Sequence, residues 1–278
     1  MVIIHRFVFN SDLLNCLTDY CDLNITYDKM SGLYILEMSE NDNCYSEVSR
    51  IMKTQGVLES IYERFSDSEL EQAEWLYIRS TWRCAYPEPR DNFKYLCTTY
   101  NMDSNALKNS KGLLCKCHLQ QKAPFTLKKT PDWKTRGFTM LYCVEDEIFI
   151  SDTVKQILDE SQLQGLDYEY VLNRHGDVLS NIHQIIINNC ADFGVYEKEV
   201  QRYSICPYCG CKKLILKPGL LSINKNSFRN IESDIVKTSE HFGEITGSRR
   251  ILISHKFFMT IKNNRIGKNL VFQPIELI

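Results

Sequence analysis

The chain has 278 residues, of which 44% are hydrophobic and 24% are charged, and its formal net charge is −2. This length supports one large domain or two smaller ones, and the composition excludes a low-complexity chain. The pI of about 6.3 argues against a protein dedicated to nucleic acid.

Local patterns predict the elements of the N-terminal segment. Residues 2–9, "VIIHRFVF", alternate between apolar and polar side chains as a strand does. Residues 45–65 have apolar side chains near helical spacing and predict an amphipathic helix. Ser66, followed three residues later by Glu69, forms a capping box, which predicts that a short helix begins there. The apolar positions assigned to the first of these helices are Val48, Ile51, Met52, Leu58 and Ile61.

Two stretches of the second half resemble each other, residues 147–172 and residues 250–277. Each contains a short apolar strand that ends at a serine, and a serine in that place can cap the helix that follows. An amphipathic helix of about ten residues, a turn and a second strand come next. We interpret this as a β-α-β unit used twice. The matched pairs include Ile148 with Ile251, Ile150 with Ile253, and Ser151 with Ser254.

Two cysteine clusters stand apart from the other thiols. Structural zinc takes four ligands, typically from two short knuckles that each present a pair of thiolates. In "CPYCG", Pro207 stiffens the turn and Gly210 can adopt the positive φ that lets the chain leave it. The clusters are Cys115, Cys117 and His118, and Cys206, Cys209 and Cys211.

The clusters predict one structural zinc ion per chain. His118 and Cys211 are substitute ligands. About 88 residues separate the clusters, so the metal acts as a staple across the domain and its binding is linked to folding. A redox pair is disfavoured because "GCKKLILK" predicts a strand after the motif rather than a helix, whereas unliganded thiols remain an alternative. An all-thiolate set leaves no position open for a catalytic water. The predicted ligands are Cys115, Cys117, Cys206 and Cys209.

Catalytic motifs are missing from the sequence: there is no phosphate-binding glycine loop, no HExxH and no GxSxG. The triad Glu145, Asp146 and Glu147 could bind a divalent cation in a metal-dependent hydrolase, but a solvated strand entry is the preferred interpretation. His175, His183 and His241 show no pairing at site spacing. We therefore expect a protein that is not an enzyme.

Charge and targeting signals give further expectations. The segment from Tyr203 to the end holds 12 Lys+Arg against 5 Asp+Glu, so it carries +7 and the remainder −9. Lys212, Lys213, Arg249 and Arg250 could share one face and contact phosphates, which keeps a zinc-ribbon nucleic-acid-binding or regulatory factor as an alternative. The N-terminus lacks the features of a signal peptide, and the apolar run at 182–190 is too short to span a bilayer. We expect a cytoplasmic protein without a membrane partner.

The CxxCG signature, the two cysteine knuckles and the two strand-Ser-helix-strand stretches resemble the double-CXXCG family of bacterial proteins, mainly over residues 113–278. The family pattern has CxxC twice, whereas the first knuckle here is Cys115-Lys116-Cys117. The resemblance implies an immunity protein that binds and neutralises a cognate toxin. It also implies metal ligation by the four predicted cysteines and assigns no catalytic residue.

The sequence as a whole predicts an α+β protein in two parts. An N-terminal α+β segment covers residues 1–110, and a body covers residues 111–278, in which a zinc site staples the two β-α-β units together. The expected function is non-catalytic binding of a protein partner, a toxin. The acidic N-terminal region suits a basic toxin such as a nuclease.

Overall fold

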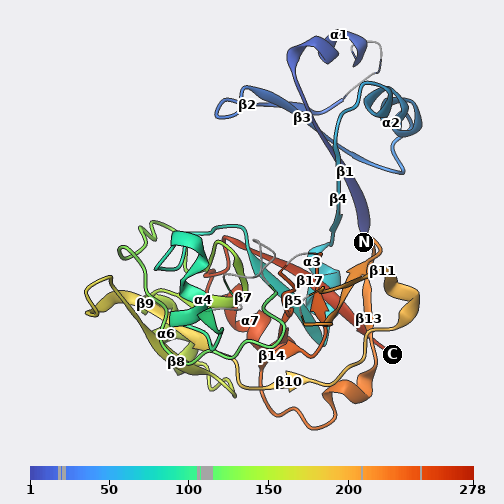
Figure 1. Cartoon of the computed structure of the whole chain (residues 1–278). Helices are drawn as coiled ribbons and strands as arrows, with labels where there is room; N and C mark the ends of the chain where they lie inside the picture. The colour runs from blue at the N-terminus through green and yellow to red at the C-terminus, as the bar shows by residue number, and fades with distance from the viewer. Residues whose placement is uncertain (18–19, 21–22, 105–106, 108–114, 208, 245) are drawn as a thin grey trace. The chain divides into compact units, whose positions relative to one another are not determined.

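The computed structural model describes residues 1–17, 20, 23–104, 107, 115–207, 209–244 and 246–278 (Figure 1). The chain forms two compact units. The first contains Met1–Glu69 and Pro218–Leu220, and the second contains Leu70–Lys217 and Leu221–Ile278. The sequence predicted a boundary near residue 110. The division falls earlier because strand β5 (Trp75–Ser80) lies inside the largest sheet of the second unit.

The first unit is an antiparallel sheet with helices packed on it, in the strand order β2-β3-β1-β4. Strand β1 (Val2–Phe9) confirms the strand predicted from the alternation. Phe7 of β1 and Leu36 of β3 meet Val48 and Met52 of α2 in the core of this unit. The other elements are η1 (Ser11–Leu13), α1 (Leu14–Leu17), β2 (Ile25–Asp28), β3 (Leu33–Ser39), α2 (Tyr45–Thr54) and β4 (Glu59–Arg64).

The helix predicted over residues 45–65 is wrong in its second half. Helix α2 ends at Thr54, and Gly56 then adopts a φ of 69°, which turns the chain out of the helix. Strand β4 follows and pairs with β1, so Ile61 lies opposite His5. Leu58 is 85% exposed and takes no part in a helical face. Pairing with a distant strand outweighed a local spacing that resembled a helix.

The capping box at Ser66 is confirmed, at the start of α3 (Asp67–Gln72). The Ser66 N–H donates to Glu69 Oε2 at 2.8 Å, and the Glu69 N–H donates to Ser66 Oγ at 3.3 Å. The two residues thus satisfy each other's free backbone donors, as this motif does at a helix start.

Three sheets build the described part of the second unit. Their strand orders are β10-β14-β16-β5-β17-β13, β6-β7-β9-β8 and β11-β12-β15. The strands are β6 (Phe138–Leu141), β7 (Val144–Ile150), β8 (Asp167–Leu172), β9 (Val178–Ile186), β10 (Cys190–Ala191), β11 (Val200–Ile205), β12 (Lys212–Leu216), β13 (Leu221–Ile223), β14 (Ile235–Thr238), β15 (His241–Phe242), β16 (Ile251–Ser254) and β17 (Leu270–Leu277). The helices are η2 (Asp91–Phe93), α4 (Tyr95–Thr98), α6 (Asp152–Glu160), η3 (Glu197–Glu199), η4 (Lys225–Phe228) and α7 (His255–Asn263).

The series of strand, capping serine, helix and strand is present in both stretches where the sequence predicted it. It consists of β7, α6 and β8 in the first, and of β16, α7 and β17 in the second. Ser151 Oγ accepts from the Val154 N–H at 3.4 Å, and Ser254 Oγ accepts from the Phe257 N–H at 3.2 Å. The two strands of each series are not neighbours, since β9 lies between β7 and β8, and β5 lies between β16 and β17. The common descent of the two stretches stays a prediction.

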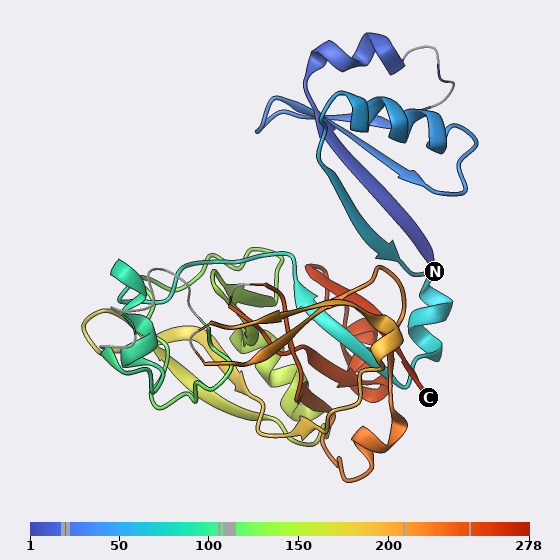
Figure 2. The same cartoon turned by 45° about the vertical axis from the view of Figure 1, so that its right-hand side comes forward.

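Helices α6 and α7 both lie in the second unit (Figures 1 and 2), and side chains from both belong to one core of that unit. Val154 and Leu158 of α6 belong to the same buried cluster as Phe257 and Ile261 of α7. The chain is therefore a mixed α+β protein in which most elements are strands. Within the described residues, none of the helices combines the length and the apolar character that crossing a membrane requires.

Candidate metal centre

The cysteine cluster at residues 206–211 lies in the turn between the antiparallel strands β11 and β12. The Cys206 N–H donates to the Cys211 carbonyl at 2.9 Å, and the Gly210 N–H donates to the Cys206 carbonyl at 2.9 Å. Gly210 has a φ of 67°, the left-handed conformation expected for it. Backbone hydrogen bonds thus close the turn into a knuckle that fixes where its thiols lie.

The loop that carries the first cluster lies against this knuckle. The Lys116 N–H donates to the Thr246 carbonyl at 3.0 Å. The Cys209 thiol donates to Cys115 Sγ at 3.4 Å, and with Cys206 these three ligand atoms lie within 4.8 Å of one another. Around a zinc ion with Zn–S bonds of about 2.3 Å, tetrahedral geometry places two sulfurs about 3.8 Å apart. Small shifts would therefore close this group around an ion.

A second group of three ligand atoms lies beside the first. It consists of Cys117, Cys211 and His241, whose ligand atoms also lie within 4.8 Å of one another. Strand β15 pairs parallel with β12, with His241 opposite Lys213. Because Lys213 follows Cys211 by two residues, this pairing brings the imidazole to the end of the knuckle.

The structure therefore distributes the predicted zinc ligands over two neighbouring groups. Cys115, Cys206 and Cys209 lie together, whereas Cys117 is grouped with Cys211 and His241. Cys117 still lies near the first group, because it follows Cys115 by two residues in the same loop.

The two histidines near the clusters differ from expectation. His118, a predicted substitute ligand, belongs to neither group in the part of the chain that the structure describes, although it lines the neighbouring cavity. His241 was missed, because it follows Cys211 by 30 residues and only the pairing of β12 with β15 brings them together. Burial and the charge of Arg249 lower the pKa of His241, which favours the neutral ring that a metal ligand needs.

The pKa values of Cys115 and Cys209, two thiols of the first group, are shifted in opposite directions. Hydrogen bonds from Cys117, and then from Cys209 and Cys206, lower the pKa of Cys115 to about 4, although burial opposes this. Burial raises the pKa of Cys209 to about 12. The lowered pKa of Cys115 favours the thiolate form, which is the form that binds a metal ion.

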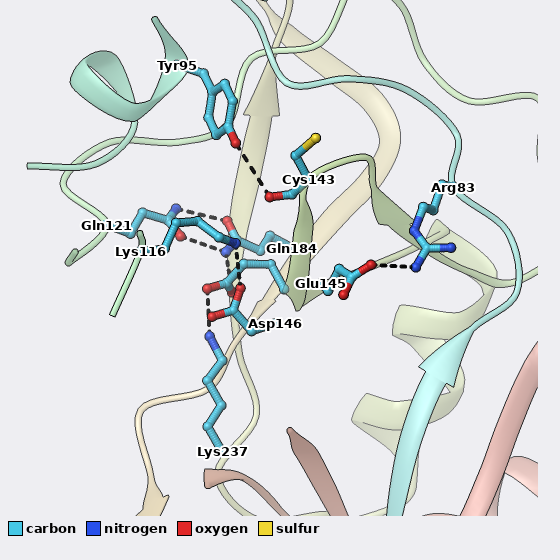
Figure 3. A network of polar contacts seen from close by, with 10 residues as sticks. Arg83, Tyr95, Lys116, Gln121, Cys143, Glu145, Asp146, Gln184 and Lys237 are labelled. Atoms are coloured by element: carbon cyan, nitrogen blue, oxygen red, sulfur yellow. Dashed lines mark hydrogen bonds and ion pairs between the residues drawn. The ribbon is translucent and has the colours of Figure 1, made fainter. Parts of the chain in front are cut away.

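The acidic triad at residues 145–147 is not the solvated strand entry that the sequence predicted (Figure 3). Glu147 pairs with Lys237 at 2.6 Å, and Asp146 pairs with Lys116 at 3.1 Å. In both pairs the carboxylate and the ammonium are largely buried. Glu145 remains exposed and pairs with Arg83 at 2.8 Å. The paired lysines come from positions 30 and 90 residues away, which local sequence could not indicate. The paired residues are Arg83, Lys116, Glu145, Asp146, Glu147 and Lys237.

A cavity of about 910 Å³ lies between this ion-pair network and the candidate metal ligands. Cys117 and His241 line it together with Lys116, Asp146 and Lys237. Burial alone would raise the pKa of Asp146, but the charges of Lys116 and Lys237 outweigh burial and hold that pKa below its ordinary value. The lowered pKa favours the charged form of Asp146, and the two ion pairs join separate segments of the cavity wall.

Amide side chains extend the network shown in Figure 3. Gln184 Nε2 donates to Glu147 Oε2 at 3.0 Å, and Gln121 Nε2 donates to Gln184 Oε1 at 2.9 Å. Gln121 lies in the segment that follows the first cysteine cluster. Polar contacts between Gln121 and Gln184 therefore join the cluster segment to strand β9.

Comparison with known proteins assigns no family to the chain: no protein-family model matches it, and none of the curated proteins does. The resemblance to the double-CXXCG family accordingly stays a prediction.

Proposed function

We propose that this chain is a non-catalytic zinc protein that binds and neutralises a cognate bacterial toxin, as an immunity protein does. The observation that carries the metal part is the meeting of Cys115 with Cys206 and Cys209 across a long loop. Zinc at these thiolates, with Cys117 as the predicted fourth ligand, joins the first cysteine loop to the β11-β12 knuckle. Its role is structural, because four thiolates complete the coordination of the ion.

The acidic triad supports a function without catalysis. Asp146 and Glu147 already have ammonium partners from this chain, and Glu145 has a guanidinium partner. The triad therefore presents no unpaired set of carboxylates to a divalent cation. Within the described residues, the candidate metal groups consist of cysteine and histidine alone.

The nucleic-acid alternative has less support, because two of the four cations that it needs are engaged within the protein. Lys213 is only 2% exposed, and its Nζ donates to the Glu244 carbonyl at 2.7 Å. The guanidinium of Arg250 stacks on the rings of Tyr77 and Phe242, at 4.6 and 4.8 Å from their centroids. Cations held in this way are poorly placed to neutralise a phosphate backbone.

The charge of the first unit supports a basic partner. Residues 1–69 contain 12 Asp+Glu against 5 Lys+Arg, a net charge of −7. A toxin that acts on nucleic acid carries a positive surface, and opposite charges speed the encounter of two proteins. We therefore propose that the partner binds to the first unit.

Capture and growth rescue test the proposed function. The tagged full-length chain, purified from the producing bacterium, should retain one protein that arrests growth when expressed alone. Co-expression of this chain should restore growth. Association should slow as salt rises, and Glu47→Lys in the first unit should slow it several-fold, whereas Glu160→Lys in the second unit should not. Absence of rescue, or binding of mixed-sequence RNA that weakens steeply with salt, would contradict the proposal.

Elemental analysis and native mass spectrometry test the zinc centre separately. Purified protein should contain zinc, and Cys206→Ser should lower both the zinc content and the unfolding temperature. Cys97→Ser is the matched control, because Cys97 belongs to neither candidate group. A metal-free protein of unchanged stability would refute the centre.

A further inference from the structure

The second ligand group offers a set of donors that zinc uses in known proteins. Two cysteines and one histidine occur at zinc sites in which three protein ligands leave a fourth position for an exchangeable group. With Zn–S bonds of about 2.3 Å and Zn–N bonds of about 2.0 Å, the donor atoms of such a site lie about 3.5 to 3.8 Å apart. The atoms of Cys117, Cys211 and His241 lie within 4.8 Å of one another, close to this spacing without a bound ion.

Three separately anchored segments supply these donors. The Lys116 N–H bonds to the Thr246 carbonyl beside Cys117, the carbonyl of Cys211 accepts from the knuckle, and His241 lies in the β12-β15 pairing. Gly247 lies close to the group, because a Cβ added there would be 2.9 Å from Cys117 Sγ. The donors are therefore positioned by backbone contacts that do not depend on a metal.

We propose that Cys117, Cys211 and His241 bind a second zinc ion, which shares the Cys117 thiolate with the first. We further propose that the fourth position of this second ion takes a small anion from the adjoining cavity. A thiolate has enough lone pairs to bridge two ions, and Cys117 belongs to the second group while following Cys115 of the first group by two residues. The proposal that the two ions share the Cys117 thiolate rests on the proposed structural zinc. The proposal of the second ion rests only on its three donors, Cys117, Cys211 and His241.

The surroundings of the second group favour an anion at the fourth position. Cys117 and His241 line the cavity of about 910 Å³ and also a neighbouring cavity of about 840 Å³. Arg249 lines the larger cavity and forms no ion pair within the described residues, where its guanidinium contacts Cys190 Sγ at 3.9 Å. A divalent ion on this cavity, together with a guanidinium that has no carboxylate partner in the described part of the chain, would attract a carboxylate or a similar small anion.

Zinc stoichiometry is the primary test. Native mass spectrometry of the full-length protein should find two zinc ions per chain. Cys211→Ser and His241→Ala should each retain one ion, with circular dichroism confirming that the variants are folded. His118→Ala is the control and should keep two, because His118 lines the same cavities but belongs to neither group.

The outcomes distinguish the two metal hypotheses. One ion in the wild type that survives both Cys211→Ser and His241→Ala would overturn the second site and leave the structural zinc intact. No zinc in the wild type would overturn both. Two ions that persist in both variants would place the second ion elsewhere and overturn its assignment to these ligands.

Cobalt substitution tests the open position. Titration with Co²⁺ should give visible bands of tetrahedral thiolate-bound cobalt up to two equivalents. Added azide should shift the bands of one equivalent and leave those of the other unchanged, because four thiolates exclude an external ligand. Arg249→Met should weaken azide binding several-fold. Spectra that azide does not alter would overturn the exchangeable position.

Discussion

Lys237 and Glu147 form an ion pair that is almost completely removed from solvent. Their charged atoms lie 2.6 Å apart, and only 4% and 8% of the side chains are exposed. Lys237→Met would leave the Glu147 charge buried without its partner, so we expect the free energy of unfolding to fall by about 3–5 kcal/mol. Denaturant unfolding measures this loss. Arg83→Met, which breaks an exposed pair on the same triad, should cost about 0–1 kcal/mol, and equal losses would contradict the argument.

Gly247 tests whether the metal ligands depend on close packing. Its φ is 65°, and an added Cβ would lie 2.6 Å from Lys213 Cδ and 2.9 Å from Cys117 Sγ. Gly247→Ala should therefore lower zinc affinity and destabilise the protein by more than about 1 kcal/mol. Gly176→Ala is the matched control, since Gly176 has a φ of 89° and nothing within 4 Å of an added Cβ. Calorimetry with and without zinc measures the stability of both variants. Equal destabilisation by Gly247→Ala and Gly176→Ala would mean that backbone strain alone explains the loss of stability.

Sequence was informative about residues whose role is set by near neighbours. The positive φ of Gly210 and the reciprocal hydrogen bonds of Ser66 and Glu69 both followed from motifs a few residues long. His241 and Lys237 could not be assigned in that way. Their partners lie tens of residues away in the chain, and the fold alone brings them together.

Two serines cap the helices of the two strand-helix-strand series, and they differ in one contact. Ser254 Oγ also donates to Asp234 Oδ1 at 2.5 Å, whereas for Ser151 Oγ the described residues offer only the capping bond. Ser151→Ala should cost about 1 kcal/mol, the usual loss for an N-cap. Ser254→Ala should cost more, because Asp234 loses a donor as well. Urea unfolding of both variants gives the comparison, and a smaller loss at Ser254 would contradict it.

At the scale of elements, the sequence predicted the order of strands and helices along the chain, but it did not predict which strands pair with each other. The strands and helices of the two series follow from apolar spacing and the capping serines, which are local signals. The insertion of β5 between β16 and β17 could not be predicted, because β5 lies more than 170 residues earlier in the chain. The same limit explains β4, whose apolar residues match a helical spacing but pair with β1.

At the scale of the molecule, the candidate metal ligands all belong to the second unit. The first unit has its own core, built around Phe7, Leu36 and Met52. The buried ion pairs of Lys116 and Lys237 and the cysteine groups lie in the second unit, and a surplus of acidic residues distinguishes the first. Under the proposed function, the second unit is the part that zinc stabilises, and the acidic first unit is the part that binds the partner.

This separation predicts that zinc stabilises one unit only. A ligand that binds the folded state at about 1,000 times its Kd adds about 4 kcal/mol to stability, and chelation removes that contribution. Hydrogen exchange measured by mass spectrometry should show that EDTA reduces protection in β11, β12 and β16, while protection in β1 and β3 stays unchanged. Cys206→Ser without EDTA should reproduce this profile, and chelator should then have a smaller further effect. Equal loss of protection in both units would contradict independent cores, and no loss in either would remove the structural role of the metal.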